Sequence, residues 1–299
     1  MYYLCFYGII AGICLYHSSL IKGRKMKNRT LTRPFEALSL AEVYSGKYAS
    51  LGNMPDKEME LLKRICKNAP KSIAEAYEFL EKKDDLFLYI YDSYAVIGGE
   101  EYFVYPFVET RRIPSGLSME IGPIGIQTSQ FHAESLSEHV AMVQVNLEEA
   151  GLSKALAGKV AVLHDIGKKY TVATNTIGDL VFYNHASVSA FIASHWAKQW
   201  HIEEQDVKIL VACIYAHMKP FTDWRTRGSH HHLAAINKKQ LFYRQLINLL
   251  NDDKNLADKT MELISLISKN DEGVSEIDDH AIEKIISGKN SLLSLTETL

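Results

Sequence analysis

The sequence predicts a mainly α-helical protein, a helical bundle preceded by a small α+β module. From residue 135 onward, apolar residues recur at three- and four-residue spacing, which is typical of helices with one buried face. Residues 86–108 are instead rich in aromatic and β-branched side chains, with Gly98-Gly99 as a turn signal. Residues 111–125 carry proline and glycine without a helical period, which indicates an irregular boundary.

These patterns divide the chain into three parts. Residues 1–25 form an apolar N-terminal segment, 26–125 form the α+β module, whose role the sequence does not reveal, and 126–299 form the helical domain. With 299 residues, of which 47% are hydrophobic and 23% charged, the chain is long enough to bury a sizeable core.

Charge and cysteine usage exclude some classes of function. A net charge of -3 provides no overall basic field for non-specific binding of nucleic acid, although a local basic patch is compatible with it. The cysteines lack CxxC spacing, so neither a thiolate zinc site nor a disulfide framework is indicated. They are Cys5, Cys14, Cys66 and Cys213. A reducing compartment is the expectation, with any metal held by histidine and carboxylate.

The N-terminal segment permits more than one interpretation. Tyr2–Tyr16 is free of charge and is followed by basic residues, but it is shorter than the roughly 20 residues that a membrane span needs. A membrane anchor through residues 2–21, a packed helix and a translation start at Met26 all remain open. In each case the rest of the chain is expected in the cytoplasm, with a membrane partner only if the anchor is real.

Local signals predict the elements in order. Residues 54–83 are helical in two pieces separated at Pro70, and Leu86–Ile97 with Tyr102–Val108 form a β-hairpin. Ser135 and Glu138 make a capping box that opens the first helix of the bundle. Further helices are expected at 153–166, 187–200, 204–217 and 238–251 and in the tail from 258.

The segment Val160–Thr171, VAVLHDIGKKYT, places His164-Asp165 at the end of an apolar helix before Gly167. Here the sequence resembles the HD superfamily of metal-dependent phosphohydrolases. LHDIGKKYT is especially similar to the HD domain of tRNA CCA-adding nucleotidyltransferases. The resemblance covers roughly residues 131–257, and it implies an HD-type helical fold.

The resemblance also implies a set of metal ligands. They are His139, His164, Asp165, His185, His217 and a late aspartate, for which Asp253 fits best while Asp252 and Asp271 remain alternatives. Histidine and carboxylate suit manganese, iron, nickel, magnesium or zinc, and residue types do not choose among these.

The resemblance implies one or two divalent ions. In its two-metal form, His185 and His217 serve the second ion and Asp165 bridges the pair, which activates water and clamps a phosphate. Lys168 would stabilise the developing negative charge. After His217, Lys219 and Arg225 are candidates to grip a substrate phosphate, with an ordinary solvated loop as an equal alternative.

The expected activity is hydrolysis of a phosphomonoester or phosphodiester, with a nucleotide or an RNA-end phosphate as substrate. An alternative is a regulatory protein whose HD domain binds nucleotide or metal without turnover, with protein partners unknown. Residues 26–125 lack the nucleotidyltransferase head of the CCA-adding enzymes, so polymerase activity is not expected.

Overall fold

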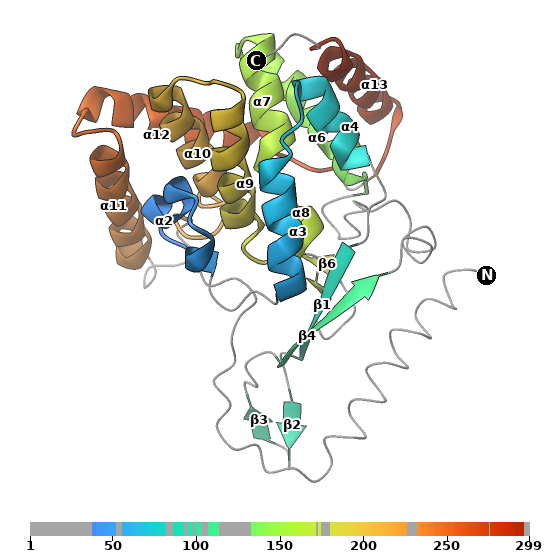
Figure 1. The fold of residues 1–299 in the computed structure, drawn as a ribbon, viewed down its shortest axis with the longest axis vertical. Helices are drawn as coiled ribbons and strands as arrows, with labels where there is room; N and C mark the ends of the chain where they lie inside the picture. Colours follow the sequence, from blue (N-terminus) through green and yellow to red (C-terminus); the bar gives the residue numbers. More distant parts are fainter. Residues whose placement is uncertain are drawn as a thin grey trace.

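The computed structural model describes residues 38–51, 56–81, 86–92, 95–97, 100–102, 107–113, 133–171, 173–174, 180–225, 232–274 and 276–295. These residues are mainly helical, as the sequence predicts, and their helices pack side by side (Figure 1). The apolar segment 1–25 lies outside the described residues, as does most of the irregular boundary predicted at 111–125. Its first three residues, 111–113, are described and belong to a strand instead.

Local signals set the ends of several helices. Ser135 and Glu138 form the predicted capping box, in which Glu138 N donates to Ser135 Oγ and Ser135 N donates to Glu138 Oε2. Pro70 lies between two helices, as predicted. The described helical elements are α2 (Leu40–Ser45), the 3-10 turn η1 (Tyr48–Leu51), α3 (Asp56–Lys67), α4 (Ile73–Glu81), α6 (Leu136–Glu149), α7 (Lys154–His164), α8 (Lys168–Thr171), α9 (His185–Gln199), α10 (Glu204–Ala216), α11 (His232–Leu249), α12 (Lys254–Asn270) and α13 (Asp279–Leu293).

The helices before the strands belong to the same hydrophobic core as the helices after residue 133. α2 and α3 contact α9, and α4 contacts α7 and α13. Trp196 Nε1 donates to Ile65 O at 3.0 Å, and Trp200 Nε1 donates to Pro70 O at 2.6 Å. Both buried indoles therefore find a hydrogen-bond partner on the front segment, as we call the described residues 38–81 that precede the strands. The structure therefore does not support a separate α+β module, because the predicted boundary near residue 125 does not divide the core.

A small sheet links the front segment to the bundle. β1 (Leu86–Asp92) pairs antiparallel with β4 (Phe107–Ile113) and parallel with β5 (Ala173–Thr174). β5 in turn pairs with β6 (Leu180–Val181), so the strand order is β4-β1-β5-β6. The stretch Leu86–Ile97, predicted as one strand, contributes to two pairings, since β2 (Ala95–Ile97) pairs with β3 (Glu100–Tyr102).

α13 covers α6 at close range because Gly288 lies where the two helices cross. A Cβ atom added to Gly288 would lie 1.8 Å from Ala141 O, a distance that real side chains do not adopt. Beside the crossing, Gln144 Nε2 donates to Ser291 Oγ at 3.3 Å. This packing fixes α6, the helix that carries His139.

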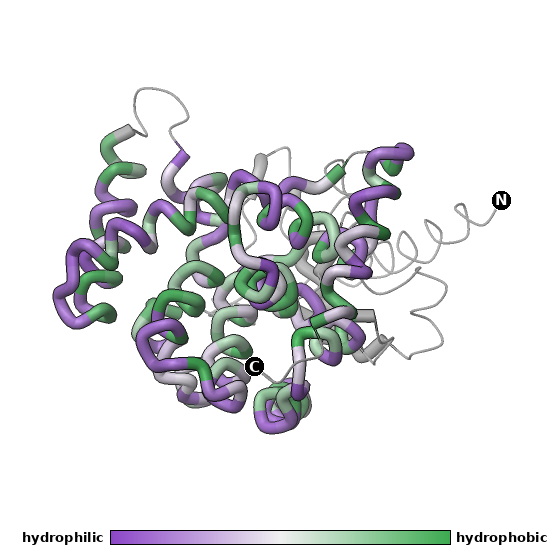
Figure 2. The backbone as a smooth tube through the Cα atoms, turned by 90° about the horizontal axis from the view of Figure 1, so that it is seen from above, coloured by the Kyte–Doolittle hydropathy of each residue, from purple (hydrophilic) through white to green (hydrophobic). Residues whose placement is uncertain are grey.

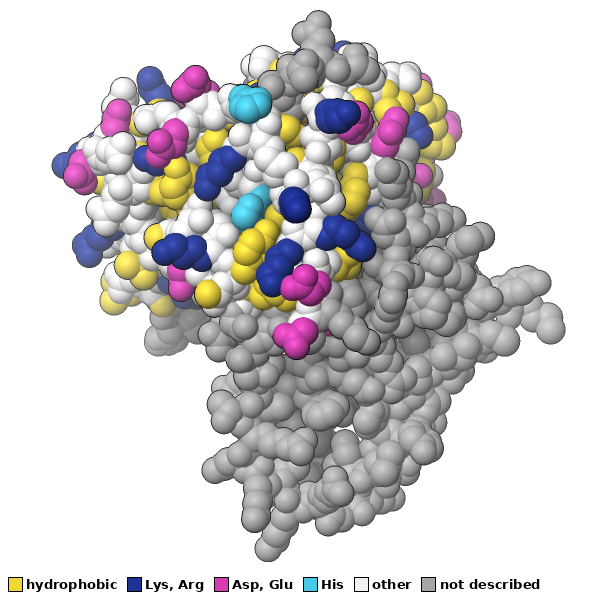
Figure 3. Space-filling view, in the orientation of Figure 1, with side chains coloured by type: hydrophobic (Ala, Val, Ile, Leu, Met, Phe, Trp, Pro, Cys, Tyr) yellow, Lys and Arg dark blue, Asp and Glu magenta, His cyan; other side chains and the backbone are white. Residues whose placement is uncertain are grey.

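The surface of the described residues is mixed in character. In Figure 2 the outer helices alternate hydrophilic and hydrophobic residues, as helices with one buried face do. Basic and acidic side chains are intermixed on the face drawn in Figure 3. Among the described residues, no helix has both the length and the apolar character needed to cross a membrane.

Replacing Gly288 by alanine is expected to destabilise the fold by about 1–3 kcal/mol, because the new methyl group forces α13 away from the Ala141 carbonyl. Chemical unfolding of the variant would measure this. Ser287→Ala, at the exposed neighbouring position of the same helix, is the matched control and should leave stability nearly unchanged. Equal stability of the two variants would contradict the close crossing.

Candidate metal centre

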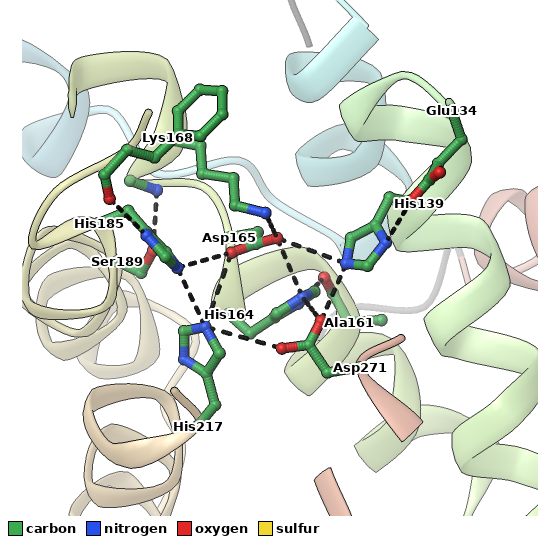
Figure 4. Close-up of polar contacts among 12 residues, drawn as sticks. Glu134, His139, Ala161, His164, Asp165, Lys168, His185, Ser189, His217 and Asp271 are labelled. Atoms are coloured by element: carbon green, nitrogen blue, oxygen red, sulfur yellow. Dashed lines mark hydrogen bonds and ion pairs between the residues drawn. The ribbon is translucent and has the colours of Figure 1, made fainter. Parts of the chain in front are cut away.

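His164 is the last residue of α7 and Asp165 follows it, and both side chains lie among the other polar residues drawn in Figure 4. Both side chains are completely buried, with 0% of either residue exposed. The last turns of α7 are apolar and buried from Val160 to Leu163, so the chain carries the carboxylate into the core. Because burying an isolated carboxylate is costly, its surroundings must compensate it.

His139, His164, Asp165 and Asp271 form the first of two groups whose candidate ligand atoms lie within 4.8 Å of one another. Asp271 Oδ1 is 2.9 Å from His139 Nε2 and 3.2 Å from His164 Nε2. Asp165 Oδ2 lies 3.5 Å and 3.3 Å from the same two nitrogens. Two imidazoles and two carboxylates thus face one volume, a donor set that suits a borderline or hard divalent cation.

Asp165, His185 and His217 form the second group. Asp165 Oδ1 is 3.3 Å from His185 Nε2 and 3.7 Å from His217 Nε2, and these two nitrogens are 3.2 Å apart. Asp165 therefore belongs to both groups and turns a different oxygen to each. α6, α7, α9, α10 and the segment after α12 supply the members, so residues far apart in sequence meet here.

The chemistry of Asp165 fits a metal site. Among the described residues, neither of its buried oxygens has a hydrogen-bond partner of good geometry. Lys168 Nζ lies 2.6 Å from Oδ2 and supplies a charge partner. Buried polar atoms normally form hydrogen bonds, and an exception often marks the position of an ion. The two groups could therefore hold a metal ion, with Asp165 as the shared ligand.

Three of the histidines are oriented by backbone carbonyls. Nδ1 of His164 lies 2.8 Å from Ala161 O, Nδ1 of His185 lies 2.7 Å from Phe182 O, and Nδ1 of His217 lies 2.6 Å from Ile214 O. A carbonyl oxygen only accepts hydrogen bonds, so Nδ1 must donate in each case. In the neutral ring this leaves the lone pair on Nε2, the nitrogen that points into the cluster.

The two groups differ in the pKa values of their histidines. Burial alone would lower the pKa of His164, but the charges of Asp165 and Asp271 overcome this and raise it to about 10. The pKa of His139 is also raised, because hydrogen bonds to Asp271 and Glu134 outweigh its burial. For His185 burial dominates and lowers the pKa to about 3, although Asp165 opposes this.

Both carboxylates are held in the charged form. Burial favours the neutral acid, but His164 and Lys168 hold the pKa of Asp165 well below its usual range. The charge of His164 and the hydrogen bond from His139 do the same for the pKa of Asp271 against its burial. The cluster therefore presents two anionic carboxylates in the core, which is the protonation state that metal binding requires.

Gly167 lets α9 approach the cluster. A Cβ atom on Gly167 would lie 2.4 Å from His185 O and 2.6 Å from Ser189 N. The Gly167 amide also donates to Ser189 Oγ at 2.9 Å. The sequence places Gly167 just after the apolar helix, and the structure adds that its missing side chain brings His185 beside Asp165.

The closing carboxylate is Asp271, one of the alternatives left open by the sequence, and the preference for Asp253 is corrected. α11 ends at Leu249, and Asp253 caps the next helix, its Oδ1 accepting from Leu256 N at 2.9 Å. α12 then runs 17 residues, about 25 Å, before Asp271 follows it. Asp253 and Asp271 therefore lie at opposite ends of one helix.

The candidate substrate-binding residues lie in the turn after His217. Lys219 Nζ is 3.2 Å from Asp223 Oδ2 and 4.8 Å from the centroid of the Tyr215 ring. Asp223 also pairs with Lys238 at 2.8 Å, so Lys219 is engaged within the loop. Arg225 is exposed.

Glu134 is a member of the site that sequence reasoning missed. It is completely buried and its Oε1 lies 3.1 Å from His139 Nδ1. Glu134 precedes the capping box, outside any helical period, so no local pattern distinguishes it from a solvated acid.

Comparison with known proteins adds no relative: no protein family, no curated protein and no solved structure matches this chain. The case for function therefore depends on the chain's own residues and geometry.

The metal-free protein is expected to lose stability as the pH rises from about 6.5 to about 10. Folding raises the pKa of His164, so its stabilising contribution is complete below the unfolded value and is lost as the pH passes the folded value. The raised pKa of His139 acts with the same sign. Urea unfolding of chelator-treated protein across this range would show the slope, which His164→Gln should reduce. Stability that stays constant or rises would contradict the assignment.

Proposed function

We propose that this chain is a metal-dependent phosphohydrolase of the HD type, acting on a phosphomonoester or phosphodiester. The observation that carries the proposal is the Asp165 carboxylate, buried between two histidine groups and facing each with a separate oxygen. The order of the residues along the chain also agrees with the resemblance: a histidine, the HD pair, two more histidines and a late aspartate.

When bound, divalent ions activate water as a nucleophile and neutralise charge on a phosphoryl group. The protein's own part is to hold the donors in place before a substrate arrives. Asp165 spans the two groups, and Asp271 extends from the first toward the second, with Oδ2 3.9 Å from His217 Nε2. Both carboxylates are buried next to helix ends and contact histidines of the cluster, so the proposal requires little reorganisation during the reaction.

In our proposal, a phosphate approaches the cluster from the side of Lys168. The side chains of Lys168 and His185 are 10% and 9% exposed, whereas those of the other three histidines are not exposed at all. The Lys168 ammonium is 5.6 Å from the centroid of the Phe182 ring and contacts Asp165. In our proposal it binds the phosphate and stabilises the negative charge that develops on it.

The proposed substrate is a nucleotide or an RNA-end phosphate, the class suggested by the resemblance of LHDIGKKYT to the HD domain of CCA-adding enzymes. Lys219 and Arg225 follow His217 closely in the chain and would add positive charge for such a substrate. For Lys219 this requires exchange of its present partner, Asp223, for phosphate.

Asp165→Ala is expected to abolish both metal retention and hydrolysis, because it removes the ligand shared by the two groups. Hydrolysis of mono- and diester substrates with added Mn²⁺ would be measured beside bound metal. Asp253→Ala is the control: it should lose about 0.5–2 kcal/mol of stability as a missing helix cap but keep both properties. Full activity in Asp165→Ala would sink the mechanism. Metal retention by the parent chain without turnover of any ester would favour the binding-only alternative.

His185→Ala is expected to reduce the number of bound transition-metal ions from about two per chain to about one, since it removes one of three donors in the second group only. Elemental analysis of the purified chain reconstituted with manganese would count them. His195→Ala is a suitable control, because His195 lies on the same helix but contacts Gly46 O instead of the cluster. An unchanged count in His185→Ala would remove His185 from the ligand set.

A further inference from the structure

Glu134 connects two parts of the chain that meet at the first group of donors. Its Oε1 lies 3.1 Å from His139 Nδ1, and its Oε2 accepts from Val274 N at 3.1 Å. Val274 is 140 residues further along the chain and three residues after Asp271. A backbone hydrogen bond from Ala133 N to Val274 O, 2.7 Å long, joins the same two segments.

His139 differs from the other histidines of the cluster in how its ring is held. Nδ1 of His164, His185 and His217 each bonds a backbone carbonyl three residues earlier. His139 lies in the first turn of α6, and its Nδ1 bonds a buried side-chain carboxylate instead. A carboxylate partner fixes the orientation of an imidazole and raises its basicity as a ligand.

The position of Asp271 also depends on Glu134, through the backbone of the segment that follows α12. It follows the last residue of α12, and residues 271–274 form neither helix nor strand. Without the hydrogen-bond ladder of a regular element, the position of this segment depends on specific contacts. Two of them are the bonds from Val274 N to Glu134 and from Ala133 N to Val274 O. Glu134 therefore influences the positions of both a histidine and an aspartate of the first group.

We propose that Glu134 is a positioning residue that holds His139 and Asp271 in place at the first metal position. One oxygen bonds His139 directly, and the other bonds Val274 in the segment that carries Asp271. This inference rests on the proposed metal-dependent function. A carboxylate offers two acceptor oxygens and no donor, whereas glutamine offers a single acceptor oxygen. Glu134→Gln therefore keeps the size of the side chain but removes one of the two acceptor oxygens that serve the buried His139 Nδ1–H and the partly buried Val274 N–H.

The test compares full-length wild type, Glu134→Gln and the matched control Glu138→Gln. Glu138 lies in the same turn as His139, but its carboxylate accepts from Ser135 N at 2.7 Å and caps the helix. Mn²⁺ titration of each protein would give the affinity and number of sites. Glu134→Gln is expected to weaken one of the two positions by about 10- to 100-fold and to leave the other unchanged. Glu138→Gln should match wild type at both.

A second readout needs no metal. In chelator-treated protein, hydrogen exchange of the Val274 amide and the NMR signal of the His139 Nδ1 proton report the two bonds directly. Glu134→Gln should speed exchange at one of these sites at least, and Glu138→Gln at neither. Glu134→Asp retains both acceptor oxygens on a shorter stem and should lose less affinity than Glu134→Gln. If Glu134→Gln does not fold, Glu134→Asp replaces it in both measurements. The expected result is then faster exchange in Glu134→Asp than in Glu138→Gln.

Two outcomes would overturn the positioning role. One is wild-type Mn²⁺ affinity at both positions in Glu134→Gln, and the other is an equal loss at both positions, which indicates general destabilisation. If wild type binds no Mn²⁺ at all, the proposed function fails instead. The exchange measurements then decide on Glu134 separately: protection that Glu134→Gln reduces supports its positioning role, and unchanged protection rejects it.

Discussion

A charged carboxylate in the middle of an apolar core must be compensated, and the arrangement of the helical domain around Asp165 follows from that constraint. The side chain ends an apolar helix, is completely buried, and has no well-formed hydrogen bond to either oxygen among the described residues. Positive and neutral nitrogen donors surround it, from Lys168 and from four histidines on separate helices. The side chains of the four histidines are all buried, so the core itself holds them around Asp165.

The helices can bring these donors together because small residues occur where backbones approach. Gly167 allows the first turn of α9, with His185, to contact the turn that follows Asp165. Gly288 lets α13 pack closely against α6, which carries His139. A side chain at position 167 would separate two segments that both carry members of the cluster, and one at position 288 would move α13 away from the helix that carries His139. Packing and site geometry are therefore set by the same contacts.

The front of the chain takes part in this packing. α3 and the turn after it accept hydrogen bonds from Trp196 and Trp200, and α4 covers α7. β1 adds to the same body by pairing with β5 between α8 and α9. α9 carries His185 at one end and these tryptophan contacts toward the other, so the front segment supports a helix of the site.

The sequence by itself determined the helical class, the capping box at Ser135 and the placement of His164 and Asp165 at the end of an apolar helix. These features depend on neighbours within a few residues, which a sequence displays directly. It also named four histidines that the structure brings together. Tertiary structure alone selected Asp271 over Asp253, because the direction of a helix about 25 Å long decides which of its ends reaches the core. It alone revealed Glu134 and the shared core of the front helices, since contacts between residues as far apart as Glu134 and Val274 leave no local pattern in the sequence.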